Sequence, residues 1–194
     1  QEGEHIEVSV KRINVVGTSA SGKSTFSKAL AQQLKVDYIE LDDLFWLDDW
    51  VESSDQEFFK KLQEKINQAP EGYVIDGNYT RTQNIKWKQI DTIIWLDLPF
   101  HTNFYRSVKR ALHRVFTQQP LWINSNNTES FKSLLSRDSI VFWMVKTHRK
   151  NREKYLKILN DPQYSDIQFI HLRSTRQMHQ FLNGLKNDKT CKTK

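Results

Sequence analysis

Residues 17–24, GTSASGKS, have the composition and spacing of a phosphate-binding loop. They fit the pattern G-x-x-x-x-G-K-[ST] in full, between a β-branched stretch and a stretch with helical periodicity. The glycines let the backbone turn so that N–H groups point at one anion, and a following helix presents its positive end to the same anion. We expect a nucleoside triphosphate here, with Lys23 on the β- and γ-phosphates and the Ser24 hydroxyl on Mg²⁺. The expected nucleotide-binding residues are Gly17, Thr18, Ser19, Ala20, Ser21, Gly22, Lys23, Ser24 and Thr25.

Four carboxylates each follow an apolar stretch, namely Asp42, Asp43, Asp76 and Asp97. If these stretches are parallel strands, the carboxylates gather near the phosphate loop, where they can take Mg²⁺ directly or through water. The alternative for an aspartate at a strand end is a helix cap or a turn residue, and this is the stronger interpretation for Asp97.

Residues 41–52 combine five acidic residues with aromatic ones, including Phe45 and Trp46. Such a segment repels a phosphate, whereas a carboxylate such as Asp42 can orient a substrate hydroxyl or accept its proton. The alternative is a solvated acidic loop with the aromatic side chains packed beneath it. Candidate acceptor-binding residues here are Asp42, Phe45 and Trp46.

Arg106, Arg110 and Arg114 recur every four residues, so they share one face of the expected helix. Their charges repel one another unless an anion lies between them, as the transferring phosphoryl group would, with Arg110 and Arg114 in the catalytic role. The alternative is a solvated basic face. Arg149 and Arg152 could complete the cluster from a later helix. Arg173, between the last expected strand and helix, could stack on the base.

The elements that must position these groups follow from hydrophobic periodicity. Strands are expected over residues 12–16, 36–40, 73–76, 92–97 and 168–172. Helices are expected over residues 23–34, 102–116, 131–159 and 175–185, the last ending near Gly184, and another begins with Asp55 as its N-cap. Strands that alternate with helices predict a three-layer α/β fold, in which a largely parallel sheet binds ligands at the carboxyl ends of its strands.

Several of these segments resemble the nucleoside monophosphate kinases of the adenylate kinase type. They are Val15–Gly17 with the loop, Tyr73–Gly77 followed by Arg81, and Ile94–Pro99 followed by the basic helix. Leu41–Trp46 and Ile75–Tyr79 are similar to the bacterial adenylate-kinase-related group often labelled DNA topology modulation proteins. The resemblance implies a P-loop fold with five parallel strands and a short lid at residues 117–130. It also implies that Asp76 is the magnesium-side carboxylate and that Arg81 holds the acceptor phosphate, with Arg152 as a further substrate-binding candidate.

Two further resemblances concern the acceptor. Glu40-Leu41-Asp42 is similar to the acid-x-acid pair of shikimate-type kinases, and Asp42–Trp46 to the acid-aromatic motif of uridine-type kinases. In both families the acid orients or deprotonates a substrate hydroxyl.

The composition bounds the class of protein. The chain has 194 residues, 38% of them hydrophobic, and its 29 basic and 23 acidic residues give a net charge of +6. Its one cysteine, Cys191, excludes an internal disulfide and a cysteine-based zinc site. We expect one cytoplasmic kinase domain over residues 12–185 with an acidic flap at 41–70, after a flexible lead-in at 1–11 and before a basic tail at 186–194.

The predicted function is phosphoryl transfer from ATP, with Mg²⁺, to a small acceptor. Arg81 favours a nucleoside monophosphate as the acceptor, and Asp42 as a base would instead suit a small hydroxyl compound. A P-loop protein that binds nucleic acid is the alternative from another class, suggested by the pI of 9.3. It is disfavoured because the basic residues gather around the expected lid and the acidic flap repels DNA. No membrane partner is expected, and the sequence leaves the oligomeric state open.

Overall fold

A sheet of five parallel strands forms the centre of the molecule, in the order β2-β3-β1-β4-β5. The computed structural model describes residues 11–18, 21–45, 52–79, 82–117 and 137–191. The strands are β1 (Arg12–Gly17), β2 (Asp37–Glu40), β3 (Tyr73–Asp76), β4 (Thr92–Leu96) and β5 (Gln168–Leu172). The five-stranded parallel sheet expected from the sequence is therefore confirmed.

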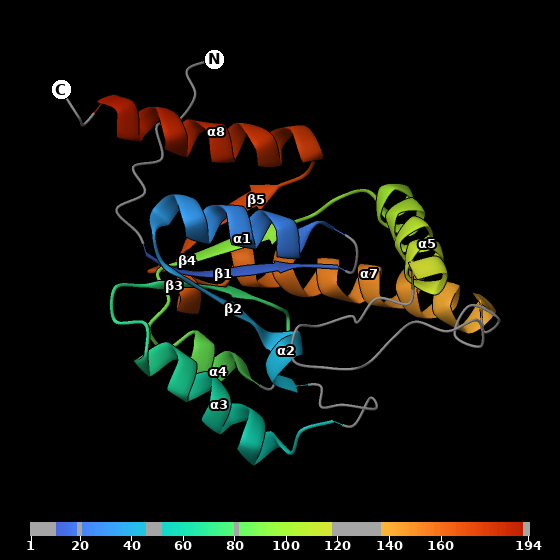
Figure 1. The fold of residues 1–194 in the computed structure, drawn as a ribbon, viewed down its shortest axis with the longest axis horizontal. Coiled ribbons are helices and arrows are strands. Elements are labelled where there is room, and N and C mark those ends of the chain that lie inside the picture. Colours follow the sequence, from blue (N-terminus) through green and yellow to red (C-terminus); the bar gives the residue numbers. More distant parts are fainter. Residues whose placement is uncertain (1–10, 19–20, 46–51, 80–81, 118–136, 192–194) are drawn as a thin grey trace.

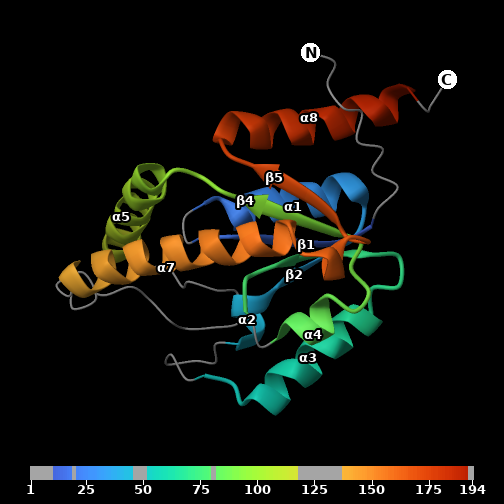
Figure 2. The same ribbon diagram turned by 180° about the vertical axis from the view of Figure 1, so that it is seen from behind.

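Helices cover both faces of this sheet (Figures 1 and 2). On one face lie α1 (Lys23–Leu34) and α8 (Thr175–Cys191), and on the other lie α2 (Leu41–Phe45), α3 (Asp55–Asn67), α4 (Gln83–Lys86) and α7 (Arg137–Leu159). Helix α5 (Phe100–Thr117) stands beyond the carboxyl ends of the strands, and a 3₁₀ turn, η3 (Pro162–Tyr164), precedes β5. Among the described residues, no helix has the length and apolar composition needed to cross a bilayer.

Alternate residues of the central strands pack into different cores. Ile13 and Val15 of β1 pack with Phe26 of α1, whereas Val16 of the same strand packs with Tyr155 of α7. A third core joins β2 and β3 to α2 and α3. Because both faces are buried, the strands read as nearly continuous apolar runs, which is why they could be found in the sequence.

Helix boundaries account for most differences from the sequence-based expectations. Ser54, not Asp55, is the N-cap of α3, and its side chain accepts a hydrogen bond from the N–H of Glu57 at 3.2 Å. Helix α8 continues through Gly184 to Cys191. Gly184 costs about 1 kcal/mol relative to alanine, which does not end a helix by itself. The short helices α2 and α4 were not predicted, because four or five residues carry no readable periodicity.

Candidate active site

The phosphate loop connects the end of β1 to the start of α1. Gly17 and Gly22 have φ angles of 157° and 86°, which favour glycine. A Cβ on Gly17 would lie 2.7 Å from the carbonyl oxygen of Leu96, so no side chain fits there. Gly22 is the N-cap of α1 and no side chain caps this helix, which leaves its N-terminal end suited to an anion. Ser19 and Ala20 lie outside the described residues.

A tyrosine connects the phosphate loop to the sheet. The Tyr38 hydroxyl donates a hydrogen bond to Asp76 Oδ2 at 2.9 Å and lies 3.4 Å from Ser24 Oγ. Burial, and secondarily the Asp76 carboxylate, raise the pKa of Tyr38 well above its ordinary value. Tyr38 is therefore a neutral donor between Ser24 and Asp76, the two residues predicted to hold magnesium.

Acidic side chains from three segments lie beside the loop. Glu40 and Asp76 are register partners in the β2–β3 pair, and Asp42 lies in the first turn of α2. Burial raises the pKa of Asp76, and the Lys23 ammonium opposes this shift. Burial, followed by the charges of Asp76 and Asp42, raises the pKa of Glu40 to about 7. The charges of these acids also act on one another, so the cluster favours a cation.

The oxygen-rich surroundings of Ser24 and Asp76 fit magnesium. Within the described ranges, no group of three or more histidine, cysteine or acidic side chains is arranged to hold a metal alone. Magnesium in kinases takes one or two protein ligands and completes its shell with water and substrate phosphates. The Ser24 hydroxyl and the Asp76 carboxylate would hold the ion, which when bound neutralises charge on the phosphates.

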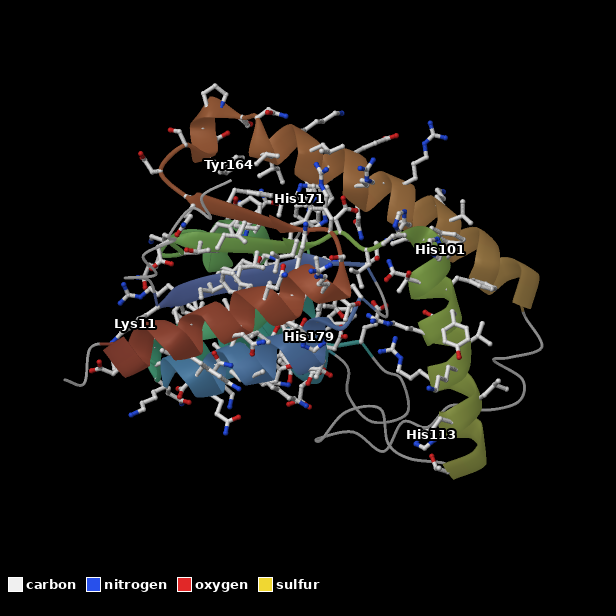
Figure 3. The ribbon with its side chains drawn as sticks, turned by 90° about the horizontal axis from the view of Figure 1, so that it is seen from above. Lys11, His101, His113, Tyr164, His171 and His179 are labelled. Atoms are coloured by element: carbon white, nitrogen blue, oxygen red, sulfur yellow. The ribbon has the colours of Figure 1, made fainter. Side chains whose placement is uncertain are left out.

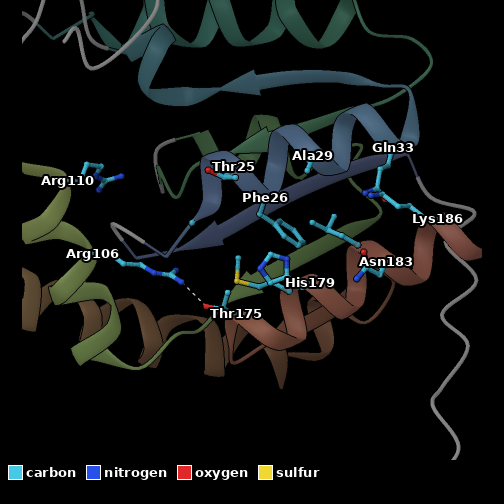
Figure 4. Close-up of a pocket in the computed structure, with 13 residues that line it drawn as sticks. Thr25, Phe26, Ala29, Gln33, Arg106, Arg110, Thr175, His179, Asn183 and Lys186 are labelled. Carbon is cyan, nitrogen blue, oxygen red and sulfur yellow. Dashed lines mark hydrogen bonds between the residues drawn. The ribbon is translucent and has the colours of Figure 1, made fainter. Parts of the chain in front are cut away.

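Two of the three clustered arginines lie at the nucleotide side of the site. Arg106 donates to Thr175 Oγ1 at 2.8 Å. Arg106 and Arg110 project from α5 into a cavity of about 570 Å³ between α1 and α8, which Thr25 also lines (Figure 4). His179 of α8 lines the same cavity (Figures 3 and 4). The side chain of Arg114 lies outside the described residues.

The remaining predicted cations lie elsewhere. Arg149, with 83% of its side chain exposed, pairs with Glu153 one turn along α7 at 3.2 Å, so it does not join Arg106 and Arg110. Arg152 contacts Asp97 Oδ2 at 3.3 Å, and the same oxygen lies 2.9 Å from His171 Nε2. His171 is on β5 beside α7 (Figure 3). Asp97 is thus held by the Arg152 guanidinium and by the His171 ring, in agreement with a structural role.

Arg173 and the aromatic residues of the flap complete the predicted set. The backbone N–H of Arg173 donates to the Gln177 side chain at 2.6 Å, and the residue is exposed. Phe45 is buried, and its ring lies 5.3 Å from that of Phe58 and 4.9 Å from that of Tyr79. Trp46, Arg81 and most of the expected lid lie outside the described residues.

Besides Tyr38 and Tyr79, three polar residues at the site were missed by sequence reasoning. Asn78 pairs through its side chain with both the N–H and the C=O of Gly17. Asn14 and Lys86, 0% and 1% exposed, both donate to the carbonyl oxygen of Gly77 at 3.2 Å. Asn14 could have been noticed as a polar residue inside an apolar strand. Lys86 carried no signal, because its burial depends on the position of α4.

The sequence of the chain is similar to those of known proteins. A family model described as an AAA domain matches residues 13–130, more than half of the chain. A shikimate kinase from Sulfurihydrogenibium sp. (strain YO3AOP1) is 30% identical over 126 residues, which cover 58% of this chain and 75% of that protein.

Solved structures of kinases also superpose on the chain. A shikimate kinase from Acinetobacter baumannii in complex with shikimate has a TM-score of 0.49 and 13% identity, over 95% of this chain and 96% of that one. A deoxyadenosine kinase from M. mycoides has a TM-score of 0.48 and 16% identity, over 90% and 98% of the two chains.

The complete phosphate loop at the end of β1, the family match and the 30% identical kinase lead to one assignment. The chain belongs to the AAA domain family and is a P-loop kinase.

Proposed function

We propose that this kinase uses ATP and Mg²⁺ to phosphorylate a hydroxyl group of a small molecule, with Asp42 as the carboxylate that receives the hydroxyl proton. The observation that carries the proposal is the meeting of Glu40, Asp42 and Asp76 beside Lys23 of the phosphate loop. In the transfer, the acceptor oxygen forms a bond to the γ-phosphorus. The bond between the γ-phosphorus and the oxygen that bridges it to the β-phosphate breaks. ADP leaves, and the acceptor proton passes to Asp42.

The charge of the acceptor side argues for a hydroxyl substrate over a monophosphate. A monophosphate brings its own anionic nucleophile and needs cationic clamps, not a base. Three neighbouring carboxylates repel such an anion but are suited to orient a hydroxyl. Arg81, which favoured a monophosphate, lies outside the described residues, and membership of the adenylate-kinase-related group stays a prediction. The relative that is 30% identical is named a shikimate kinase, which also supports the hydroxyl proposal.

The other residues have defined roles in this proposal. Lys23 binds the phosphates, Ser24 and Asp76 hold Mg²⁺, and Arg106 and Arg110 reach the nucleotide from α5. The Tyr79 hydroxyl donates to Asp42 Oδ1 and so fixes the direction of the carboxylate toward the acceptor.

The test is Asp42→Asn, with Asp43→Asn as the matched control. Asp43 is the next residue of α2, about 100° around the helix, and its charge acts less strongly on Glu40 than that of Asp42. Hydroxy acids, polyols, nucleosides and nucleoside monophosphates are first screened with ATP and Mg²⁺. With the best acceptor, we expect Asp42→Asn to lower turnover by about 10²-fold or more, with ATP affinity unchanged. We expect Asp43→Asn to stay near wild type.

A wild-type enzyme that phosphorylates only monophosphates would contradict the proposal. Turnover of Asp42→Asn equal to that of Asp43→Asn would contradict it as well.

A further inference from the structure

The turn that follows β3, Gly77–Tyr79, lies between the two halves of the site. The N–H of Gly77 donates to the carbonyl oxygen of Val15 at 3.2 Å, which extends the pairing of β3 with β1. Gly77 has a φ of 145°, and a Cβ there would lie 2.9 Å from Leu41 Cβ. The turn therefore packs directly against the start of α2, next to Asp42.

Asn78 joins this turn to the phosphate loop. Its Oδ1 accepts from the N–H of Gly17 at 2.9 Å, and its Nδ2 donates to the carbonyl oxygen of Gly17. One side chain thus satisfies both backbone groups of the first loop residue, where the β1–β3 ladder has ended. The Tyr155 hydroxyl of α7 donates to the same Oδ1 at 3.4 Å, which fixes the orientation of the amide.

Tyr79 joins the turn to the acceptor side. Its hydroxyl donates to Asp42 Oδ1. Its ring packs against Phe45 and Phe58, with centroids 4.9 Å and 5.4 Å away. These contacts hold the hydroxyl in place independently of the hydrogen bond.

Buried donors hold the first residue of the turn, Gly77. The carbonyl oxygen of Gly77 accepts from Asn14 Nδ2 and from Lys86 Nζ, both at 3.2 Å. Asn14 is held in turn by Trp87 Nε1, which donates to its Oδ1 at 3.0 Å. A buried ammonium is costly unless it is hydrogen-bonded, so Lys86 favours the one backbone conformation that offers it this carbonyl.

We propose that the turn Gly77–Tyr79 positions groups in both halves of the site, the nucleotide half and the acceptor half. Asn78 is the positioning residue for the phosphate loop, and Tyr79 is the positioning residue for Asp42. The positioning role of Asn78 depends only on the phosphate loop, whereas that of Tyr79 rests on the proposed function.

The experiment separates the roles of Asn78 and Tyr79. ADP with Mg²⁺ is titrated calorimetrically into wild type, Asn78→Ala, Tyr79→Phe and a control, Asn160→Ala. Asn160 also donates its amide to a backbone carbonyl, that of Leu156, but at the end of α7. We expect Asn78→Ala to weaken ADP binding about tenfold, and Tyr79→Phe and the control to bind as wild type. With the best hydroxyl acceptor, we expect Tyr79→Phe to lower turnover about tenfold at unchanged nucleotide affinity.

A general loss of structure would move both measurements together in both variants, and that result overturns the proposal. ADP affinity equal to wild type in folded Asn78→Ala also overturns it. If Asn78→Ala does not fold, Asn78→Ser, which keeps a short polar side chain, is measured in the same way. If wild type phosphorylates no hydroxyl compound, the proposed function fails. The ADP titration still decides whether Asn78 positions the phosphate loop.

Discussion

The nucleotide half and the acceptor half of the site differ in how the chain supplies them. The nucleotide half is a continuous segment, Gly17–Ser24, completed by the start of α1. The acceptor half takes Glu40 from β2, Asp42 from α2 and Asp76 from β3, and the β2–β3 register places Glu40 opposite Asp76. In the proposed function, a local motif therefore provides phosphate binding, whereas sheet register provides the chemistry directed at the acceptor.

The two halves also carry opposite charges. Lys23, Arg106 and Arg110 lie on the nucleotide side, together with the positive end of α1. The acceptor side is acidic, and burial, followed by the charges of Asp76 and Asp42, raises the pKa of Glu40 to about 7. In the proposed function, this contrast directs phosphates to one half and uncharged or metal-bound groups to the other.

The largest expected effect lies in the nucleotide half. Lys23→Ala should abolish measurable ATP binding and turnover while the fold stays intact, because Lys23 acts as a charge on the phosphates and is not part of a core. Calorimetry with ATP and Mg²⁺, together with a thermal unfolding curve, checks this. Wild-type ATP affinity in the variant would show that the phosphate loop does not bind the nucleotide.

A smaller effect is expected for Arg110→Ala. Turnover should fall about 10²–10³-fold with a smaller change in ATP affinity, because a cation on the transferring phosphoryl group acts mainly in the transition state. Steady-state kinetics and ATP titration of the same preparation measure the two quantities. Equal losses in affinity and turnover would instead make Arg110 a ground-state ligand of the nucleotide.

The smallest expected effect is on stability. It comes from two ionisable groups with shifted pKa values, Glu40 on the acceptor side and Lys86 beneath the turn Gly77–Tyr79. The pKa of Glu40 is raised from 4.5 to about 7, so between these values the folded state holds the proton and the unfolded state does not. The free energy of unfolding should therefore fall as the pH rises from 4.5 to 7. The raised pKa of Asp76 acts in the same direction.

Lys86 acts in the opposite direction. Burial, followed by the charges of Lys154 and Lys23, lowers its pKa from 10.5 to about 7. Between these values the unfolded state holds the proton, so the free energy of unfolding should rise with pH, by at most about 1.4 kcal/mol per pH unit. Together the two groups predict a minimum in stability near pH 7.

Urea unfolding from pH 5 to 9 tests this profile. Lys86→Met should flatten the rise above pH 7, and Glu40→Gln should reduce the fall below it. A profile of Lys86→Met that matches wild type would mean that Lys86 is not charged differently in the folded and unfolded chains.

Short-range signals made much of the fold predictable. The helix Lys23–Leu34 and the strands Tyr73–Asp76 and Gln168–Leu172 have the expected bounds, because apolar periodicity and flanking turn residues mark them locally. Helix α2 was not predicted. It is five residues long, and Leu41, its first residue, is buried and in contact with Gly77.

The sequence by itself determined the phosphate loop, the order of strands and helices, and the kinase class, because each depends on neighbouring residues in the chain. Tertiary structure alone decided which other polar groups join Asp42 and Asp76 at the site. It buried Lys86 beneath the turn, paired the Asn78 side chain with Gly17, and placed Tyr38 between Ser24 and Asp76. The physical reason is that these contacts join residues from 9 to 61 positions apart, at distances set by strand register and helix packing.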